Sequence, residues 1–426
     1  MPTCDSHLPD RTLLRRATRL RLAAGVALVA AALIGPAAVC AQAYSVYGSV
    51  SAEARYTWNE LAAPAPQVSV PLAARLTHSL AADAFDLTAR TVVVSAATVA
   101  DPAATQIRVP ELSLSTYLTP WLTTRVGRFG LDWGSSYVFA PGNALYAAAS
   151  GADGGGVNGV SISVIPAPSV SIGAAVSLTD LAPTETARPW EEFVSAAWVD
   201  GFVAGVDWFA GFQYGHDTLL RPSVAASLDV LGTIIAAEAA VELAERHTYP
   251  NETYDFVGRD DPAAIAAVAL QHSLAGRDVS ASAMVEYLYT GLGFSAEEAD
   301  RIYDLALSDM IDLPTLGRVR GLGLSGASEA NTMPDVGTAS DAAPLGQHYL
   351  ASEISFDWYD HLTVSLSGVV NLTDAGFIAT SEITVVALTA LDLYVRGGLM
   401  WGPSRRTEFG VAGHAAEIAV GARVNM

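Results

Sequence analysis

Arginine is the residue type whose placement in this sequence most directly suggests chemistry. All 23 basic residues are arginine, against 44 Asp and Glu residues, and the formal net charge is −21. Six arginines alternate with apolar residues, on what would be the polar face of extended segments: Arg55, Arg75, Arg90, Arg125, Arg396 and Arg423. A guanidinium is permanently charged and offers several N–H donors, so this row predicts electrostatic recognition of polar solutes.

Acidic residues occupy equivalent polar-face positions in the middle of the chain: Asp229, Glu238, Glu242, Glu286 and Glu353. If the segments close into a cylinder, the first and last are neighbours, and the six arginines share one wall opposite the acids. Walls of opposite charge would create a transverse field that orders water and favours polar or zwitterionic solutes. Local neutralisation is the alternative, because further acids share the inward phase of the arginines: Glu53, Asp86, Glu111, Asp392 and Glu417.

Motifs for covalent chemistry are weak in this chain. The run GLGLSG at 321–326 matches the dinucleotide pattern G-x-G-x-x-G, but it lacks the strand and helix that give the pattern meaning. There is no H-E-x-x-H, no phosphate-binding loop and no nucleophile elbow, and the only cysteines are Cys4 and Cys40. The sequence therefore predicts neither an enzyme nor a cofactor or metal site, and its acidity argues against nucleic-acid binding.

Long segments with a two-residue repeat position these charges. Most are 10–14 residues long, whereas strands of globular sheets average about 5–6 and a tilted strand needs about 9–11 to cross a bilayer. We expect eighteen strands, at 44–58, 68–81, 84–97, 106–118, 121–131, 157–165, 169–178, 191–200, 202–213, 221–230, 233–244, 263–273, 277–290, 347–358, 361–372, 377–388, 391–401 and 414–426. A Greek-key sandwich would also alternate, so the repeat alone does not decide the fold.

The connections decide between those folds. Gaps of one to three residues alternate with longer ones, as short periplasmic turns and long outer loops do in a transmembrane barrel. Closing the sheet pairs every backbone group that lipid cannot satisfy. The sequence thus predicts an all-β, antiparallel up-and-down transmembrane barrel over 44–426, of about 18 strands with a range of 14–18. We expect aromatics near the membrane interfaces: Tyr44, Trp58, Trp198, Trp208, Phe356, Trp358, Tyr359 and Trp401.

Residues 1–43 have the features of a secretory signal peptide. Five arginines between positions 11 and 21 precede an apolar run at 22–34, and Ala41-Gln42-Ala43 forms an A-x-A cleavage site. A transmembrane anchor is disfavoured because the run is shorter than a bilayer span. Acylation of Cys40 is a further alternative, although Val39 stands where Gly or Ala is usual.

Two long outer connections stand out, at 132–156 and 291–346. The second carries nine acids and three arginines. In it, Ser295 and Glu298 form a capping box that begins a helix at about 296–311. This connection could cover the barrel mouth or bind cations, or it could be an ordinary solvated loop.

The first connection supports a family resemblance. The residues Gly127-Arg128-Phe129, Trp133-Gly134 and Pro141-Gly142-Asn143 resemble a pattern in bacterial outer-membrane porins, where Gly-Arg precedes Trp-Gly and a later Pro-x-Asn. In porins the third outer loop commonly folds inward and narrows the pore. The resemblance implies this role for 132–156, with candidate constriction residues Trp133, Tyr137, Phe139, Pro141 and Asn143. It spans a short stretch, and the chain ends in Met426 where such barrels often end in a Phe that the assembly machinery reads.

These observations predict a porin-like channel of the bacterial outer membrane that passes small polar solutes by passive diffusion. Its expected partners are those solutes and the surrounding lipid and lipopolysaccharide or an equivalent, with a homo-oligomer left open. The competing interpretation is a surface barrel with a plugged lumen that acts as an adhesin or interaction protein through its long loops.

Overall fold

The computed structural model describes residues 43–59, 63–98, 104–130, 134–135, 137–139, 141, 157–178, 193–215, 220–243, 247–250, 256–259, 261–307, 346–359, 361–404, 406–411 and 414–426. These residues form one antiparallel sheet of 18 strands, in which successive strands pair with each other. The last strand, β20, pairs with β19 and also with β1, so the sheet closes on itself. The predicted up-and-down barrel is confirmed, at the upper end of the predicted range of strand number.

The first half of the barrel wall consists of β1 Ala43–Asn59, β2 Ala63–Ala82, β3 Phe85–Thr98, β4 Ala104–Thr119, β5 Leu122–Phe129, β6 Val157–Ala167, β7 Val170–Leu178, β8 Phe193–Val203 and β9 Val206–Gly215. The second half consists of β10 Arg221–Val230, β11 Thr233–Glu242, β14 Ala263–Ala275, β15 Val279–Thr290, β16 His348–Trp358, β17 Leu362–Asn371, β18 Phe377–Leu388, β19 Leu391–Trp401 and β20 Ala415–Asn425. Each of the eighteen predicted segments corresponds to one of these strands.

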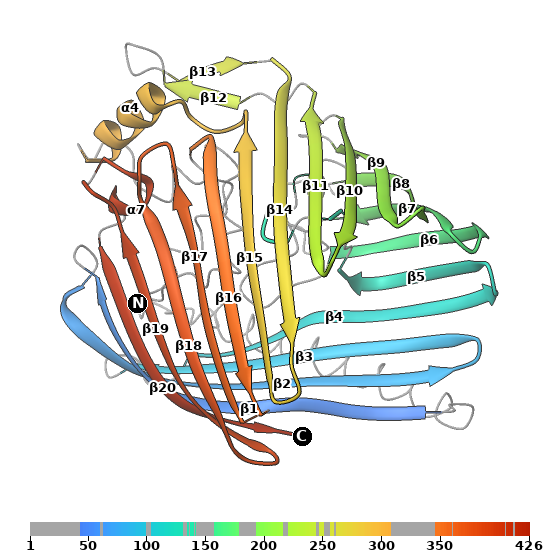
Figure 1. Cartoon of the computed structure of the whole chain (residues 1–426), viewed down its shortest axis with the longest axis horizontal. Helices are drawn as coiled ribbons and strands as arrows, with labels where there is room; N and C mark the ends of the chain where they lie inside the picture. Colours follow the sequence, from blue (N-terminus) through green and yellow to red (C-terminus); the bar gives the residue numbers. More distant parts are fainter. Residues whose placement is uncertain are drawn as a thin grey trace, which may run out of the picture.

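Short turns lie at one end of the barrel and longer connections at the other (Figure 1). At the long-connection end, a hairpin of β12 His247–Pro250 and β13 Phe256–Arg259 accompanies helices α4 Ala296–Leu307 and α7 Glu408–Val411. Two predicted boundaries are wrong, and one hairpin was not predicted. The β8–β9 turn lies at Ala204 and Gly205, which both have positive φ, and not at Gly201. The first outer connection is short, since β1 and β2 pair as far as Asn59 and Ala63, and the β12–β13 hairpin was not predicted.

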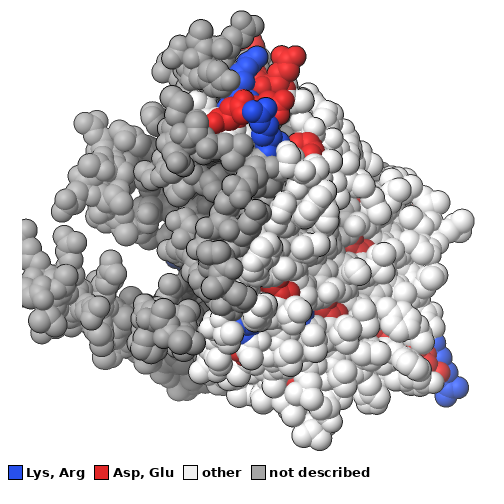
Figure 2. Space-filling view, turned by 90° about the vertical axis from the view of Figure 1, so that its left-hand side faces the viewer, with Lys and Arg blue, Asp and Glu red and all other residues white. Residues whose placement is uncertain are grey.

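The outer face of the wall is apolar. Ile354 and Ile418 are each 58% exposed although they lie in the middle of strands. Figure 2 shows a largely uncharged surface with a few scattered acidic patches, a dense group of charges at its upper end and a smaller group at its lower right corner. Along β16, ten steps of about 3.4 Å separate His348 from Trp358, and a tilt of about 40° makes this height about 26 Å, close to the apolar band of an outer-membrane barrel. The exposed apolar surface therefore matches a hydrocarbon layer.

One predicted interface aromatic faces the interior instead. Trp198 pairs with Gly173 and Gly211 on the neighbouring strands, and it shares its phase with the buried Ala196. A Cβ atom on Gly173 would overlap the indole ring. Gly173 thus leaves room for the indole on the inner wall, and the alternation of apolar and polar residues gave no sign of that space, so Trp198 was misplaced.

Part of the barrel interior is filled by a hydrophobic cluster. Phe139, from the connection between β5 and β6, is 8% exposed and packs among inward residues of β14 to β20, including Leu288, Tyr349 and Met400. Its ring lies 6.2 Å from that of Tyr349. The chain after β5 therefore returns into the barrel and contacts the wall formed by strands much later in the sequence.

No helix in the described part of the chain is both long and apolar enough to cross a bilayer.

Candidate functional site: the inner wall and the loop it binds

Strand register places all six predicted arginines on the inner face. Arg55 pairs with Ser69 and Ala419, and Arg75 pairs with Ser49, positions opposite in phase to the exposed Val50 and Leu72. The remaining four have the same inward phase on β3, β5, β19 and β20. Because β20 is next to β1, these residues come from one continuous part of the wall. Whether they line a path for solutes is a question of function, considered below.

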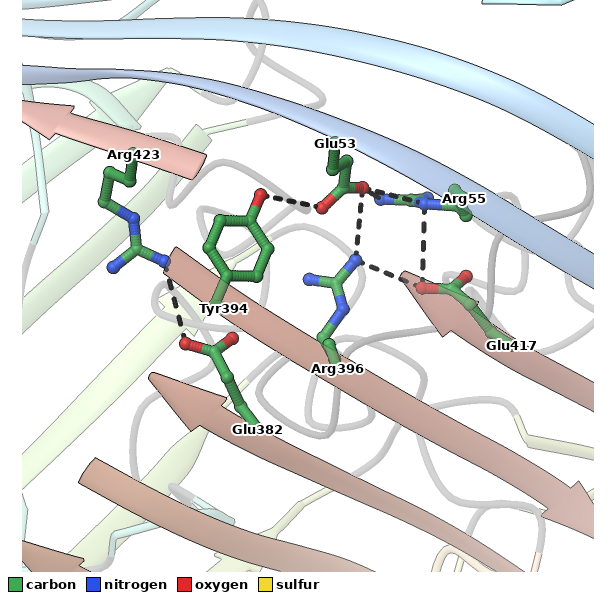
Figure 3. A network of polar contacts seen from close by, with 7 residues as sticks. All are labelled: Glu53, Arg55, Glu382, Tyr394, Arg396, Glu417 and Arg423. Atoms are coloured by element: carbon green, nitrogen blue, oxygen red, sulfur yellow. Dashed lines mark hydrogen bonds and ion pairs between the residues drawn. The ribbon is translucent and has the colours of Figure 1, made fainter. Parts of the chain in front are cut away.

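Two of the arginines are neutralised in a compact network (Figure 3). Arg55 donates to Glu53 and lies 3.6 Å from Glu417, measured from Nε to Oε1. Arg396 contacts the same two carboxylates, at 3.4 Å from Glu53 and 3.1 Å from Glu417. Two guanidinium groups and two carboxylates thus form a tetrad that joins β1, β19 and β20. The alternative of local neutralisation describes these arginines correctly.

Arg423 and Arg125 have weaker or more local partners. The guanidinium of Arg423 lies 3.7 Å from Glu382 and 5.3 Å from the ring centre of Tyr394. Arg125 lies 2.6 Å from Glu111, and its guanidinium also lies 4.9 Å from the ring centre of Phe129. The partner of Arg423 is therefore Glu382 on β18, which was not among the neutralising acids expected from the sequence.

Arg75 and Arg90 differ from the other four arginines. Within the described part of the chain, neither forms an ion pair. Both line a hollow of about 350 Å³ on the inner wall, together with Ser49, Thr77, Thr88 and Glu111. The carboxylate of Glu111 pairs with Arg125 at 2.6 Å, so the two guanidinium groups of Arg75 and Arg90 share this hollow with one acid that is already engaged.

The acidic residues expected on the opposite wall bind the inward loop. Glu286 is fully buried and accepts three backbone N–H groups, from Tyr137 and Val138 at 2.8 Å each and from Phe139 at 2.9 Å. Glu238 accepts the N–H of Ser135 at 3.0 Å, and the Ser135 hydroxyl donates to the Ala237 carbonyl at 3.1 Å. A carboxylate that accepts several N–H donors forms strong, charge-assisted bonds. These two acids hold residues 135 and 137–139 against β11 and β15.

The prediction of an open acidic wall needs correction for three of its five members. Glu238 and Glu286 are buried beneath the loop, and Glu242 is 2% exposed and lies 3.3 Å from Arg221. Asp229 is exposed but caps the β10–β11 turn, accepting the N–H of Gly232 at 2.8 Å. Glu353 is exposed on the inner face of β16. Of the five predicted acids, Asp229 and Glu353 are therefore the two that are exposed.

The structure describes three of the five candidate constriction residues. Phe139 and Pro141 are buried, whereas Tyr137 is 43% exposed with its backbone fixed by Glu286. Trp133 and Asn143 lie outside the described residues. Pattern reasoning did not connect this segment with Glu238 and Glu286. One signal was available, since Glu286 is an acid between the inward apolar residues Met284 and Leu288, where a carboxylate needs donors.

A second polar network lies where α4 meets the loops at the barrel mouth. Tyr303 of α4 donates to Asp374 at 2.8 Å, and Asp374 also accepts the N–H of Glu408 at 2.6 Å. Glu408 in turn accepts the hydroxyl of Tyr349 at 2.5 Å. Burial, followed by the charges of Glu408 and Asp374, raises the pKa of Tyr303 well above its ordinary value. The network ties α4 and α7 to the wall.

The capping box predicted at the start of α4 is present. Ser295 and Glu298 exchange hydrogen bonds, with the Ser295 N–H donating to Glu298 at 2.9 Å and the Glu298 N–H donating to the Ser295 hydroxyl at 3.4 Å. On the exposed side of the helix, Asp304 lies 2.7 Å from Arg406. No group of three or more His, Cys, Asp or Glu residues in the described ranges is arranged to hold a metal ion.

A closed antiparallel barrel of 18 strands, with an apolar exterior and a loop bound inside, is the architecture of outer-membrane porins. The fold is similar to crystal structures of three such porins of the Occ/OprD group. OccAB1 of Acinetobacter baumannii has a TM-score of 0.52 at 11% identity, covering 91% of this chain and 97% of that chain. OccK2 (OpdF) of Pseudomonas aeruginosa has a TM-score of 0.51 at 10% identity, covering 90% of this chain and 98% of that chain. OccK8 (OprE) of the same organism has a TM-score of 0.51 at 8% identity, covering 91% of this chain and 99% of that chain.

Sequence comparison adds no closer relative. No family model matches the chain, and no curated protein matches it. At identities near one residue in ten, the likeness to the solved structures concerns the fold.

Proposed function

We propose that the protein is an outer-membrane porin, a passive channel for small polar solutes. The observation that carries this proposal is the loop segment of residues 135 and 137–139, which two wall carboxylates hold inside the barrel. Because this segment lies against β11 and β15, the space left for solutes is displaced toward the strands that carry the arginines. Solutes would move down their own gradient, and the width of this space would limit their size.

The arginine wall would give the channel its charge preference. Arg55 and Arg396 contribute little, because Glu53 and Glu417 neutralise them. Arg75 and Arg90 keep their charge facing the hollow between β1 and β3, so we assign them the larger effect on passing ions. Arg423, with its long contact to Glu382, would act with them.

Planar-bilayer recordings test this assignment. Replacing both Arg75 and Arg90 with Gln should shift the reversal potential in a salt gradient toward cation preference. Arg128→Gln is the matched control, since Arg128 pairs with Leu112 and Asn158 on the outer, lipid-facing phase and is exposed. An unchanged reversal potential in the double variant would show that the arginine wall has no role in selectivity.

The plugged-barrel alternative has one supporting observation, the network that fixes α4 and α7 at the mouth. Single-channel current separates the two functions. A steady open current from the purified protein supports the channel, whereas a barrel that inserts into the bilayer without conducting supports the interaction protein.

A further inference from the structure

The N-terminal end of β1 continues past the end of the strand that closes the barrel. The last bonds between them join Gly48 and Met426, with N–O distances of 3.1 and 2.9 Å. Residues 43–47 extend β1 further and pair with residues 77–81 of β2 on one side. On the other side, where β20 would continue, none of the residues that the structure describes pairs with them.

Hydrogen-bonding groups line this free side. In antiparallel sheets, every second residue directs both its N–H and its C=O to the same neighbouring strand. Gly48 directs both groups to Met426, so Val46 and Tyr44 direct theirs to the same side. The edge therefore offers two donors and two acceptors at the spacing of a further strand.

The edge lacks the features with which proteins usually block strand addition. Charged side chains, prolines and bulges serve that purpose on most exposed edges. This segment reads AYSVY, and the side chains of Tyr44 and Val46 are 59% and 46% exposed. Tyrosine and valine are among the residues that favour strands. Such an edge is a template for strand addition by an extended peptide.

A hollow beside the edge gives the added strand a charge preference. It measures about 420 Å³ and is lined by Tyr47, Gly48, Ser49, Arg75, Arg423, Asn425 and Met426. Inward side chains of a strand paired with β1 would face these guanidinium groups, and outward side chains would lie beside Tyr44 and Val46. Acidic residues facing inward and apolar residues facing outward fit this position.

We propose that the β1 edge at Tyr44 and Val46 binds an extended peptide of a separate periplasmic protein by strand addition, antiparallel to β1, with acidic side chains turned toward Arg75 and Arg423. The assignment to the periplasm rests on the proposed function, which places the short-turn end of the barrel there. The bound strand would pair with residues 43–47 on the side opposite β2.

Binding of a fluorescein-labelled peptide of alternating valine and glutamate to the purified full-length protein tests the proposal by anisotropy. Val46→Pro removes the edge N–H, but no bond to β2, because the Val46 N–H points away from β2. We expect this variant to bind about tenfold or more weakly, whereas Val46→Thr, which keeps the donor, should bind normally. Replacing Arg75 and Arg423 with Gln should weaken binding of this peptide, but not of its valine–glutamine counterpart.

Several results would overturn the proposal. Absence of binding to the native protein, or equal binding to a Val46→Pro variant that still shows the heat-dependent gel shift of a folded barrel, would do so. A dimer in light scattering that Val46→Pro abolishes would assign the edge to a second copy instead. Conductance measured on the same preparations separates the hypotheses, since a barrel that conducts but ignores the peptide refutes only the docking site.

Discussion

Tyr394 reaches Glu53, two strands away, by lying across Gly421. Tyr394 pairs with Gly421 in the β19–β20 ladder, and Gly421 pairs with Glu53 in the β20–β1 ladder. The phenol donates to Glu53 at 3.0 Å, and a Cβ atom on Gly421 would overlap the ring. Glycine is therefore required at this position by the close approach of an aromatic ring, which links the first strand of the barrel to the last two.

We expect Gly421→Ala to weaken barrel closure. The methyl group would displace Tyr394 from Glu53, removing one hydrogen bond to a charged group and forcing strain, at a cost of about 2–4 kcal/mol. The temperature at which the folded gel band is lost should fall. Gly397→Ala is the matched control, since its Cβ would meet only the rotatable Ser381 hydroxyl at 3.2 Å. Equal unfolding temperatures for both variants would contradict the proposed role of Tyr394.

We expect Glu286→Gln to release the inward loop. Glutamine keeps one acceptor, but it turns an NH₂ group toward N–H donors and loses the charge that strengthens all three bonds to residues 137–139. The loss should be about 2–4 kcal/mol of loop binding. Single-channel conductance and open-state noise should both increase. The control Glu353→Gln removes an exposed inner-wall carboxylate that does not contact the loop, and it should leave the conductance and the open-state noise unchanged. If Glu286→Gln also left the conductance and the noise unchanged, Glu286 would not be what holds the loop in place.

The contact between α4 and the wall should weaken at alkaline pH. The pKa of Tyr303 is raised above its ordinary value near 10 when the contact is formed. Below about pH 10, Tyr303 is protonated whether or not the contact is formed, so its contribution is complete. Above that pH the released form ionises first, and the contribution falls as pH rises through the raised pKa.

A fluorescent label on α4 measures this transition. Residues beyond Cys40 include no cysteine, so Ala296→Cys combined with Cys4→Ser and Cys40→Ser provides a unique exposed attachment point on α4. The label should report release of α4 above about pH 10, and Tyr303→Phe should lack the component due to Tyr303. Identical titrations of the two proteins would exclude Tyr303 as the titrating group.

Intact-mass measurement of the membrane-extracted protein checks the predicted export signal. We expect cleavage after Ala43 and a mature chain that begins at Tyr44. Acylation at Cys40 would instead add the mass of lipid chains and of residues 40–43, and Cys40→Ser would abolish that addition. A retained segment 1–43 would refute the cleavage prediction.

Sequence alternation identified the wall of this barrel because a two-residue repeat reports directly which side of a strand a residue faces. It placed Arg55, Arg75 and Arg90 on the inner face, in agreement with the register. It misplaced Trp198, because Gly173 lets the large indole ring pack on the inner side. The alternation of apolar and polar residues along one strand carries no information about the space that a glycine leaves on the neighbouring strand.

The two-residue repeat could not predict the hydrogen-bond and ion-pair partners of the charged residues. Glu286 binds the backbone of Tyr137, which is 149 residues away, through a loop whose path no local repeat encodes. Arg423 pairs with Glu382 on β18, because reach and direction of the side chains decide among several inward acids. Which side of the sheet a side chain faces is set locally, by its position along the strand. Which partner a charged side chain contacts depends on how barrel closure places the loops and the neighbouring strands.

The two longest strands carry one side of the wall beyond the membrane. β2 has 20 residues and β1 has 17. At about 3.3 Å per residue and a tilt near 40°, β2 rises roughly 50 Å, about twice the thickness of the apolar band. Its first five residues, APAPQ, precede the alternating stretch that begins at Val68. A molecule that approaches from the outer side would therefore meet the β1–β2 hairpin well outside the hydrocarbon layer.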